Sequence, residues 1–118
     1  MAPVEVSPGA GVGGSSEGVR VGRDGPRTAV WLSGEHDLAS ARLLSMALAE
    51  AMADNDADMV VDLTELAFMD ASTLGVLVRG RQLLTGRGRC LTLRSPQRFP
   101  RKVIDACGLT ELIEGAAS

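Results

Sequence analysis

The chain has 118 residues, of which 45% are hydrophobic, 23% charged and 3% aromatic, and its formal net charge is −3. This composition is that of one soluble globular domain. The negative charge gives no general drive towards nucleic acid or an anionic membrane, and so few aromatic side chains leave little for stacking on bases.

The cysteines and the apolar runs bear on where the protein works. Cys90 and Cys107 match no metal-ligand spacing and do not make a disulfide scaffold, which favours a reducing cytoplasm. Cys90 sits in an apolar run, so we expect it to pack in the core. The first residues lack the basic and apolar regions of a signal peptide, and no apolar run approaches the roughly 20 residues that span a bilayer. We therefore expect a cytoplasmic protein that does not enter a membrane.

Gly, Ser and Pro are concentrated in residues 1–18, which offer little apolar surface to bury against the entropy of ordering. This composition predicts a flexible N-terminal tail, followed by one folded domain over residues 19–118.

Hydrophobic periodicity predicts the elements of that domain. In chain order they are strands at 19–21 and 28–33, a helix with an apolar stripe over 43–52, a strand at 59–63, a helix from 71, a strand at 90–93, a helix over 103–106 and a short one over 109–113. The turn at 23–26 joins the first two strands as a hairpin. The order predicts a single α/β domain, with a mixed sheet of four or five strands and helices packed mainly on one face.

The stretch from Asp70 to Thr73 turns the chain from strand to helix and has two readings. In the structural reading, Asp70 caps the helix while Ser72 and Thr73 satisfy free backbone N–H groups. In the functional reading, a kinase phosphorylates one of these hydroxyls and places a charge of about −1.5 to −2 beside Asp70. Residue types and spacing alone favour the cap.

Other site chemistries find little support. The chain has one histidine, His36, and no Gly-x-Ser-x-Gly elbow, so a hydrolytic triad has no basis. A lone histidine beside a strand end is typically a surface or packing residue. Two separated cysteines and one histidine give no metal site either. We therefore predict no catalytic residues, no metal and no cofactor.

Four motifs together carry a family resemblance. Residues 68–77, Phe-Met-Asp-Ala-Ser-Thr-Leu-Gly-Val-Leu, resemble the signature of the STAS-domain anti-sigma factor antagonists. Residues 34–37, Gly-Glu-His-Asp, are similar to the Gly-Glu-Leu-Asp turn of that family. Residues 61–63 resemble its strand before the signature, and residues 104–109 its late helix-glycine-leucine element. The motifs occur in the family order over residues 18–115.

The resemblance implies a bacterial cytoplasmic switch that works by protein–protein binding and not by catalysis. Such antagonists bind an anti-sigma factor that is also a serine kinase, and so release a sigma factor. Phosphorylation at the start of the signature helix prevents binding, and a phosphatase restores it. By match to the family, the residues on or near the docking surface are Asp37, Asp70, Ala71, Ser72, Thr73, Leu74, Gly75 and Arg79.

One departure from the family pattern concerns the phosphorylated residue. The family places the modified serine directly after the aspartate, and here that position is Ala71, which cannot accept phosphate. Either the role passes to Ser72, with Thr73 second, or this chain is not switched by phosphorylation. Two other functions stay open: a STAS interaction module within a larger signalling assembly, and a sensor of a small ligand.

Overall fold

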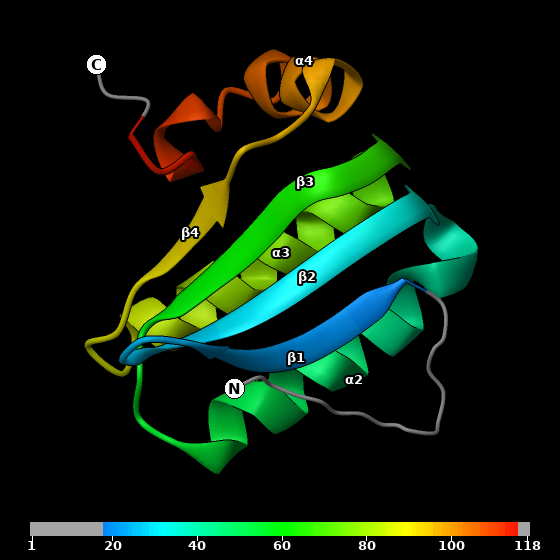
Figure 1. Cartoon of the computed structure of the whole chain (residues 1–118). Coiled ribbons are helices and arrows are strands. Elements are labelled where there is room, and N and C mark those ends of the chain that lie inside the picture. The colour runs from blue at the N-terminus through cyan, green and yellow to red at the C-terminus, as the bar shows by residue number, and fades with distance from the viewer. Residues whose placement is uncertain (1–17, 116–118) are drawn as a thin grey trace.

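The sheet of this protein is mixed. A computed structural model describes residues 18–115, so the predicted tail lies outside the described residues except for Gly18. The strands are β1 (Val19–Asp24), β2 (Arg27–His36), β3 (Met59–Met69) and β4 (Leu91–Arg94), side by side in that order. β1 and β2 form the predicted antiparallel hairpin, whereas β3 runs parallel to both β2 and β4. The predicted α/β class and the number of strands are confirmed (Figure 1).

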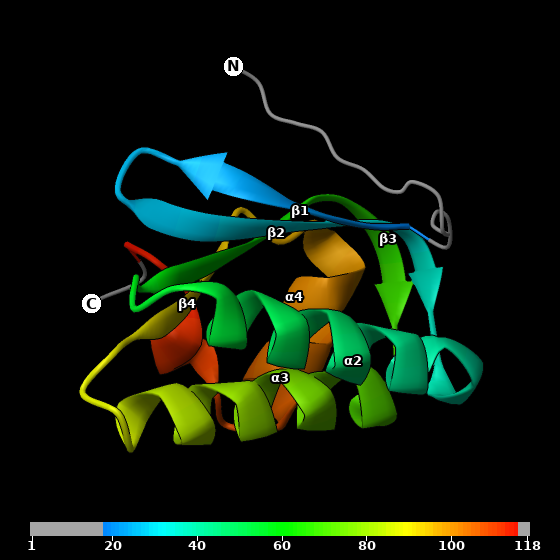
Figure 2. The ribbon, with the colours of Figure 1, turned by 90° about the horizontal axis from the view of Figure 1, so that it is seen from below.

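The two long helices cover one face of the sheet. Helix α2 (Leu38–Asp54) follows β2 and α3 (Ala71–Thr85) follows β3, and both return across the same face (Figure 2). A β-carbon at Gly80 would lie 3.2 Å from the Cε atom of Met52 and 3.4 Å from the Cδ1 atom of Leu48. The glycine therefore allows α3 to approach α2 closely.

Helix α4 (Arg98–Ala106) packs beside the second half of β3, and the 3₁₀ helix η1 (Thr110–Leu112) ends the described fold. The core between the sheet and these helices is aliphatic. Its largest fully buried side chains are Leu32, Leu44, Leu48, Met59, Leu63, Leu66, Met69, Leu74, Leu77, Leu84, Leu93 and Ile104. No aromatic ring of the described residues belongs to this core.

Three expectations differ from the structure. Strand β3 continues past residue 63 to Met69, because it stays paired with β2 although polar residues interrupt its apolar run. Helix α4 begins at Arg98 and not near residue 103, since its basic first turn hid the helical pattern. The expected burial of Cys90 is wrong, because this residue lies exposed just before β4.

The second face of the sheet carries no helix of the described residues (Figure 2). By strand alternation Ala29 and Val60 point to this face, and both are nevertheless fully buried. Arg20 and Trp31 are partners in the β1–β2 register and belong to this face too, and the guanidinium carbon of Arg20 lies 4.7 Å from the centre of the Trp31 ring.

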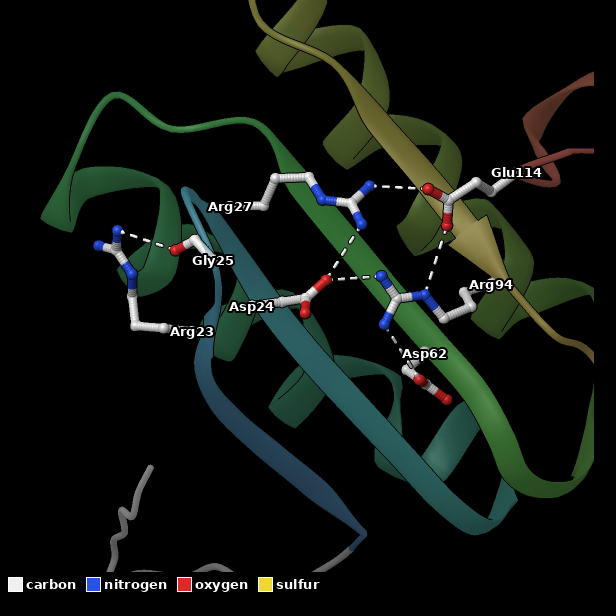
Figure 3. Close-up of polar contacts among 7 residues, drawn as sticks. All are labelled: Arg23, Asp24, Gly25, Arg27, Asp62, Arg94 and Glu114. Atoms are coloured by element: carbon white, nitrogen blue, oxygen red, sulfur yellow. Dashed lines mark hydrogen bonds and ion pairs between the residues drawn. The ribbon is translucent and has the colours of Figure 1, made fainter. Parts of the chain in front are cut away.

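A network of ion pairs lies on this face (Figure 3). Arg94 donates to Asp24 at 2.6 Å and to Glu114 at 3.3 Å, and it lies 3.6 Å from Asp62. Arg27 donates to the same two acids, to Asp24 at 3.0 Å and to Glu114 at 2.9 Å. The network ties β1, β2 and β3 to the end of the described chain.

Because of this network, we expect the free energy of unfolding to change with pH in the acid range. The hydrogen bonds and charges of Arg94 and Arg27 hold the pKa of Asp24 below its usual 3.8, and Arg27 and Arg94 hold that of Glu114 below 4.5. Carboxylates with a lowered folded pKa stabilise the protein above their unfolded pKa, and this stabilisation is lost as pH falls through the folded value. We expect urea unfolding to show a loss of stability below about pH 4.5 that is smaller in the Arg94→Met variant. An equal pH dependence in both proteins would contradict this.

Candidate functional site

The carboxyl ends of β2 and β3 meet at one edge of the sheet. The register pairs Glu35 with Phe68 and His36 with Met69, and each strand is followed at once by an aspartate that begins a helix. We call residues 35–40 and 68–73 the capped edge. In open α/β sheets, ligands and partners bind outside the carboxyl ends of parallel strands. This position makes the capped edge the first candidate for a functional site.

Asp70 is the polar centre of one half of the capped edge. Its Oδ1 atom accepts three hydrogen bonds: from the Ser72 hydroxyl at 2.6 Å, from the Thr73 backbone N–H at 3.1 Å and from the Thr73 hydroxyl at 3.3 Å. The Ser72 hydroxyl, followed by the groups of Thr73, holds the pKa of Asp70 below its usual 3.8. The predicted cap of α3 is therefore confirmed.

The two hydroxyls beside Asp70 differ in exposure. Thr73 has no exposed surface, whereas Ser72 is partly exposed. A kinase needs a hydroxyl that it can reach, so the folded chain offers Ser72 and not Thr73. Ala71, directly after the cap, is exposed and brings no hydroxyl.

The other half of the capped edge is built around Asp37. Its Oδ1 atom accepts the backbone N–H of Ala39 at 2.9 Å, and its own N–H donates to the Ser40 hydroxyl at 3.1 Å. This reciprocal capping box satisfies free N–H groups at the start of α2. Asp37 itself remains exposed.

His36 links this capping box to the beginning of β1. The ring is fully buried, with Nδ1 3.1 Å from the Ser40 hydroxyl and Nε2 3.3 Å from the Gly18 carbonyl oxygen. Since a carbonyl can only accept, Nε2 carries the hydrogen at the Gly18 contact. A β-carbon at Gly18 would collide with the Ser33 carbonyl oxygen, so glycine is needed at this contact. His36 is thus a packing residue, one of the two roles expected for it.

The predicted site residues differ in how far their side chains are exposed to solvent. Asp37, Ala71, Gly75 and Arg79 are exposed. Thr73 and Leu74 are buried at 0% and 2% exposure, because this side of the first turn of α3 faces the core. Thr73 therefore contributes to the cap and Leu74 to the core, and neither side chain is presented at the surface.

Sequence reasoning missed several exposed groups at or beside the capped edge. Leu38, the first residue of α2, is 74% exposed, and the ring of Phe68 stacks on that of Phe99 from α4. Glu35 adds an exposed carboxylate in register with Phe68. Phe68 lies within the quoted signature, but only the fold shows that its ring points outward, and nothing local in the sequence places Phe99 beside it.

Two features, a metal-binding cluster and a membrane-spanning helix, are absent from the described part of the chain. Residues 18–115 bring together no three His, Cys, Asp or Glu side chains that could hold a metal ion. None of the helices described there combines the length and the apolar character needed to cross a membrane. The capped edge brings together exposed carboxylates, exposed apolar groups and the partly exposed hydroxyls of Ser40 and Ser72.

The sheet order, the helix pair on one face and the two aspartate-capped helix starts define a STAS-like domain. The family model described as "Mlab, STAS domain" matches residues 19–114, and the chain belongs to this family. The resemblance seen in the motifs is thereby confirmed. A search of curated proteins finds no match.

Solved structures with the same fold include anti-sigma factor antagonists. Unphosphorylated SpoIIAA is 20% identical with a TM-score of 0.73, and the match covers 85% of this chain and 89% of that one. The phosphorylated form, from Bacillus, is 20% identical with a TM-score of 0.66, over 85% and 92%. An anti-sigma factor antagonist from Mycobacterium paratuberculosis is 24% identical with a TM-score of 0.73, over 81% of each chain. At these identities the likeness establishes the fold.

Proposed function

We propose that this protein is a cytoplasmic anti-sigma factor antagonist. In this account it binds an anti-sigma factor of the serine-kinase type through the capped edge and so releases a sigma factor. Phosphorylation of Ser72 prevents this binding, and a phosphatase removes the phosphate. The protein acts by binding and catalyses no reaction of its own.

The observation that carries the proposal is the surroundings of Ser72. Its partly exposed hydroxyl lies 2.6 Å from the Oδ1 atom of Asp70, in the first turn of α3. The fold around it is shared with SpoIIAA, whose structure exists in unphosphorylated and phosphorylated forms. Membership in the STAS family supports the same reading.

Phosphate on Ser72 would alter the surface without unfolding the domain. It adds a charge of about −1.5 to −2 at a helix start, where the helix dipole favours anions. The same phosphate lies beside the Asp70 carboxylate, and the neighbouring strand end brings Asp37 to the same edge. A phosphate is larger and more strongly hydrated than the hydroxyl that it replaces, so a partner that packs against this hydroxyl loses its fit and must strip water from a charged group, and binding weakens while the fold persists.

The test is direct binding of the purified protein to each candidate anti-sigma kinase, with ADP or ATP present. We expect a complex with one of them, and after incubation with ATP a phosphate on the peptide that contains residues 70–80. The control is Leu83→Ala, which changes an exposed residue of α3 about 16 Å along the helix from Ser72. Absence of any complex would overturn the function, whereas a complex without phosphate would overturn only the switch.

A further inference from the structure

Both phenylalanines of the chain lie at the surface. Phe68 is 36% exposed and Phe99 is 46% exposed, and the core of the described residues contains no aromatic ring. Their rings stack with centres 5.2 Å apart and planes 16° from parallel. Exposed apolar groups that gather in one place typically mark an interaction surface, and aromatic side chains are enriched among the residues that dominate binding energy.

The aromatic pair is held in place by two rigid elements. Phe68 is near the end of β3, and Phe99 belongs to the first turn of α4. The side chain of Gln97 donates to the Thr64 carbonyl oxygen at 2.6 Å, and Pro100 is buried beneath the helix start. The pair is therefore organised before any partner arrives, and little conformational entropy is lost when it is covered.

Charges of opposite sign flank the pair. Glu35 is exposed and pairs in the β2–β3 register with Phe68. Lys102 is exposed and lies one helical turn after Phe99, hence on the same side of α4. Neither residue forms an ion pair within residues 18–115. The surface thus runs from an unpaired acid across two rings to an unpaired base.

We propose that Phe68 and Phe99 form the apolar anchor of the partner interface, extending the docking surface from the capped edge onto α4. The occupant is a segment of the anti-sigma factor that presents a cationic, an apolar and an acidic side chain in that order. The cation faces Glu35, the apolar side chain covers the rings, and the acid faces Lys102. This inference rests on the proposed function for the identity of the partner and adds the chemistry that the partner must carry.

The experiment measures the affinity of the anti-sigma kinase, with ADP, for the wild-type protein and for matched variants. Phe99→Ala removes half of the anchor, while Leu83→Ala removes a side chain of similar exposure, 52%, on α3. We expect at least a tenfold loss of affinity for Phe99→Ala and less than a twofold change for Leu83→Ala. Lys102→Glu and Glu35→Lys change exposed charges without disturbing packing, and each is expected to weaken binding by about threefold.

The outcomes separate this inference from the function on which it rests. If the wild-type protein binds and Phe99→Ala binds as well as Leu83→Ala, the anchor is refuted and the proposed function stands. If Phe99→Ala does not fold, the charge variants decide: unchanged affinity for both refutes the flanking arrangement and with it the proposal. If no anti-sigma kinase binds the wild-type protein, both proposals are overturned.

Discussion

Phosphorylation of Ser72 is expected to weaken binding to the anti-sigma factor by about 100-fold, because a bulky phosphate must lose its hydration and find room where the partner packs against a hydroxyl. The phosphate would stand beside Asp70, whose Oδ1 atom lies 2.6 Å from the Ser72 hydroxyl. Ser72→Asp carries about half of that charge, and we expect it to weaken binding by about tenfold. Titration calorimetry with the purified partner measures both effects.

Two further variants control this result. Ser72→Ala removes the hydroxyl that would receive the phosphate. We expect this variant to bind with an affinity within about threefold of wild type and to take no phosphate in the first turn of α3. Ala71→Ser restores the serine that the family pattern places after the aspartate, at an exposed position of this chain. We expect it to gain a second phosphorylation site. Undiminished binding by protein fully phosphorylated at Ser72 would contradict the switch.

Replacement of Asp70 by alanine is expected to destabilise the domain by about 2–3 kcal/mol. Loss of an N-cap costs about 1 kcal/mol, and a buried hydroxyl without an acceptor costs roughly a further 1–2 kcal/mol. That hydroxyl belongs to Thr73, which has no exposed surface and donates to Asp70. Urea denaturation at pH 7 gives the difference in unfolding free energy.

The matched control for this prediction is Asp37→Ala. Asp37 is an exposed N-cap that accepts one backbone N–H, from Ala39, and leaves no buried hydroxyl behind. We therefore expect a cost of about 1 kcal/mol. If both replacements cost the same, the buried hydrogen bond of Thr73 contributes nothing to stability.

Local sequence signals predicted the elements that depend on local chemistry. The cap at Asp70 follows from the residue types at the end of a strand, and the Asp-Gly turn gave the hairpin, whereas the cap at Asp37 was not predicted. The extension of β3 was missed because the exposed residues Thr64 and Glu65 interrupt its apolar run, whereas its pairing with β2 continues to Met69. Whether an apolar run continues as a strand depends on neighbours that the run itself does not encode.

The candidate site was predicted in outline, and tertiary packing decided the rest. The motifs located the two helix starts, but the burial of Thr73 depends on which side of α3 meets the core. The role of His36 required Gly18 to lie next to it in the fold. The stacking of Phe99 on Phe68 joins residues 31 positions apart, which no periodicity in either segment indicates.

The most direct test of the central claim is release of the sigma factor. The purified protein is added in increasing amounts to a preformed complex of the sigma factor and its anti-sigma kinase, and free sigma factor is measured. We expect release by the wild-type protein and by Ser72→Ala, with about tenfold more Ser72→Asp needed for the same release. No release by wild-type protein at a large excess over the complex would contradict the account.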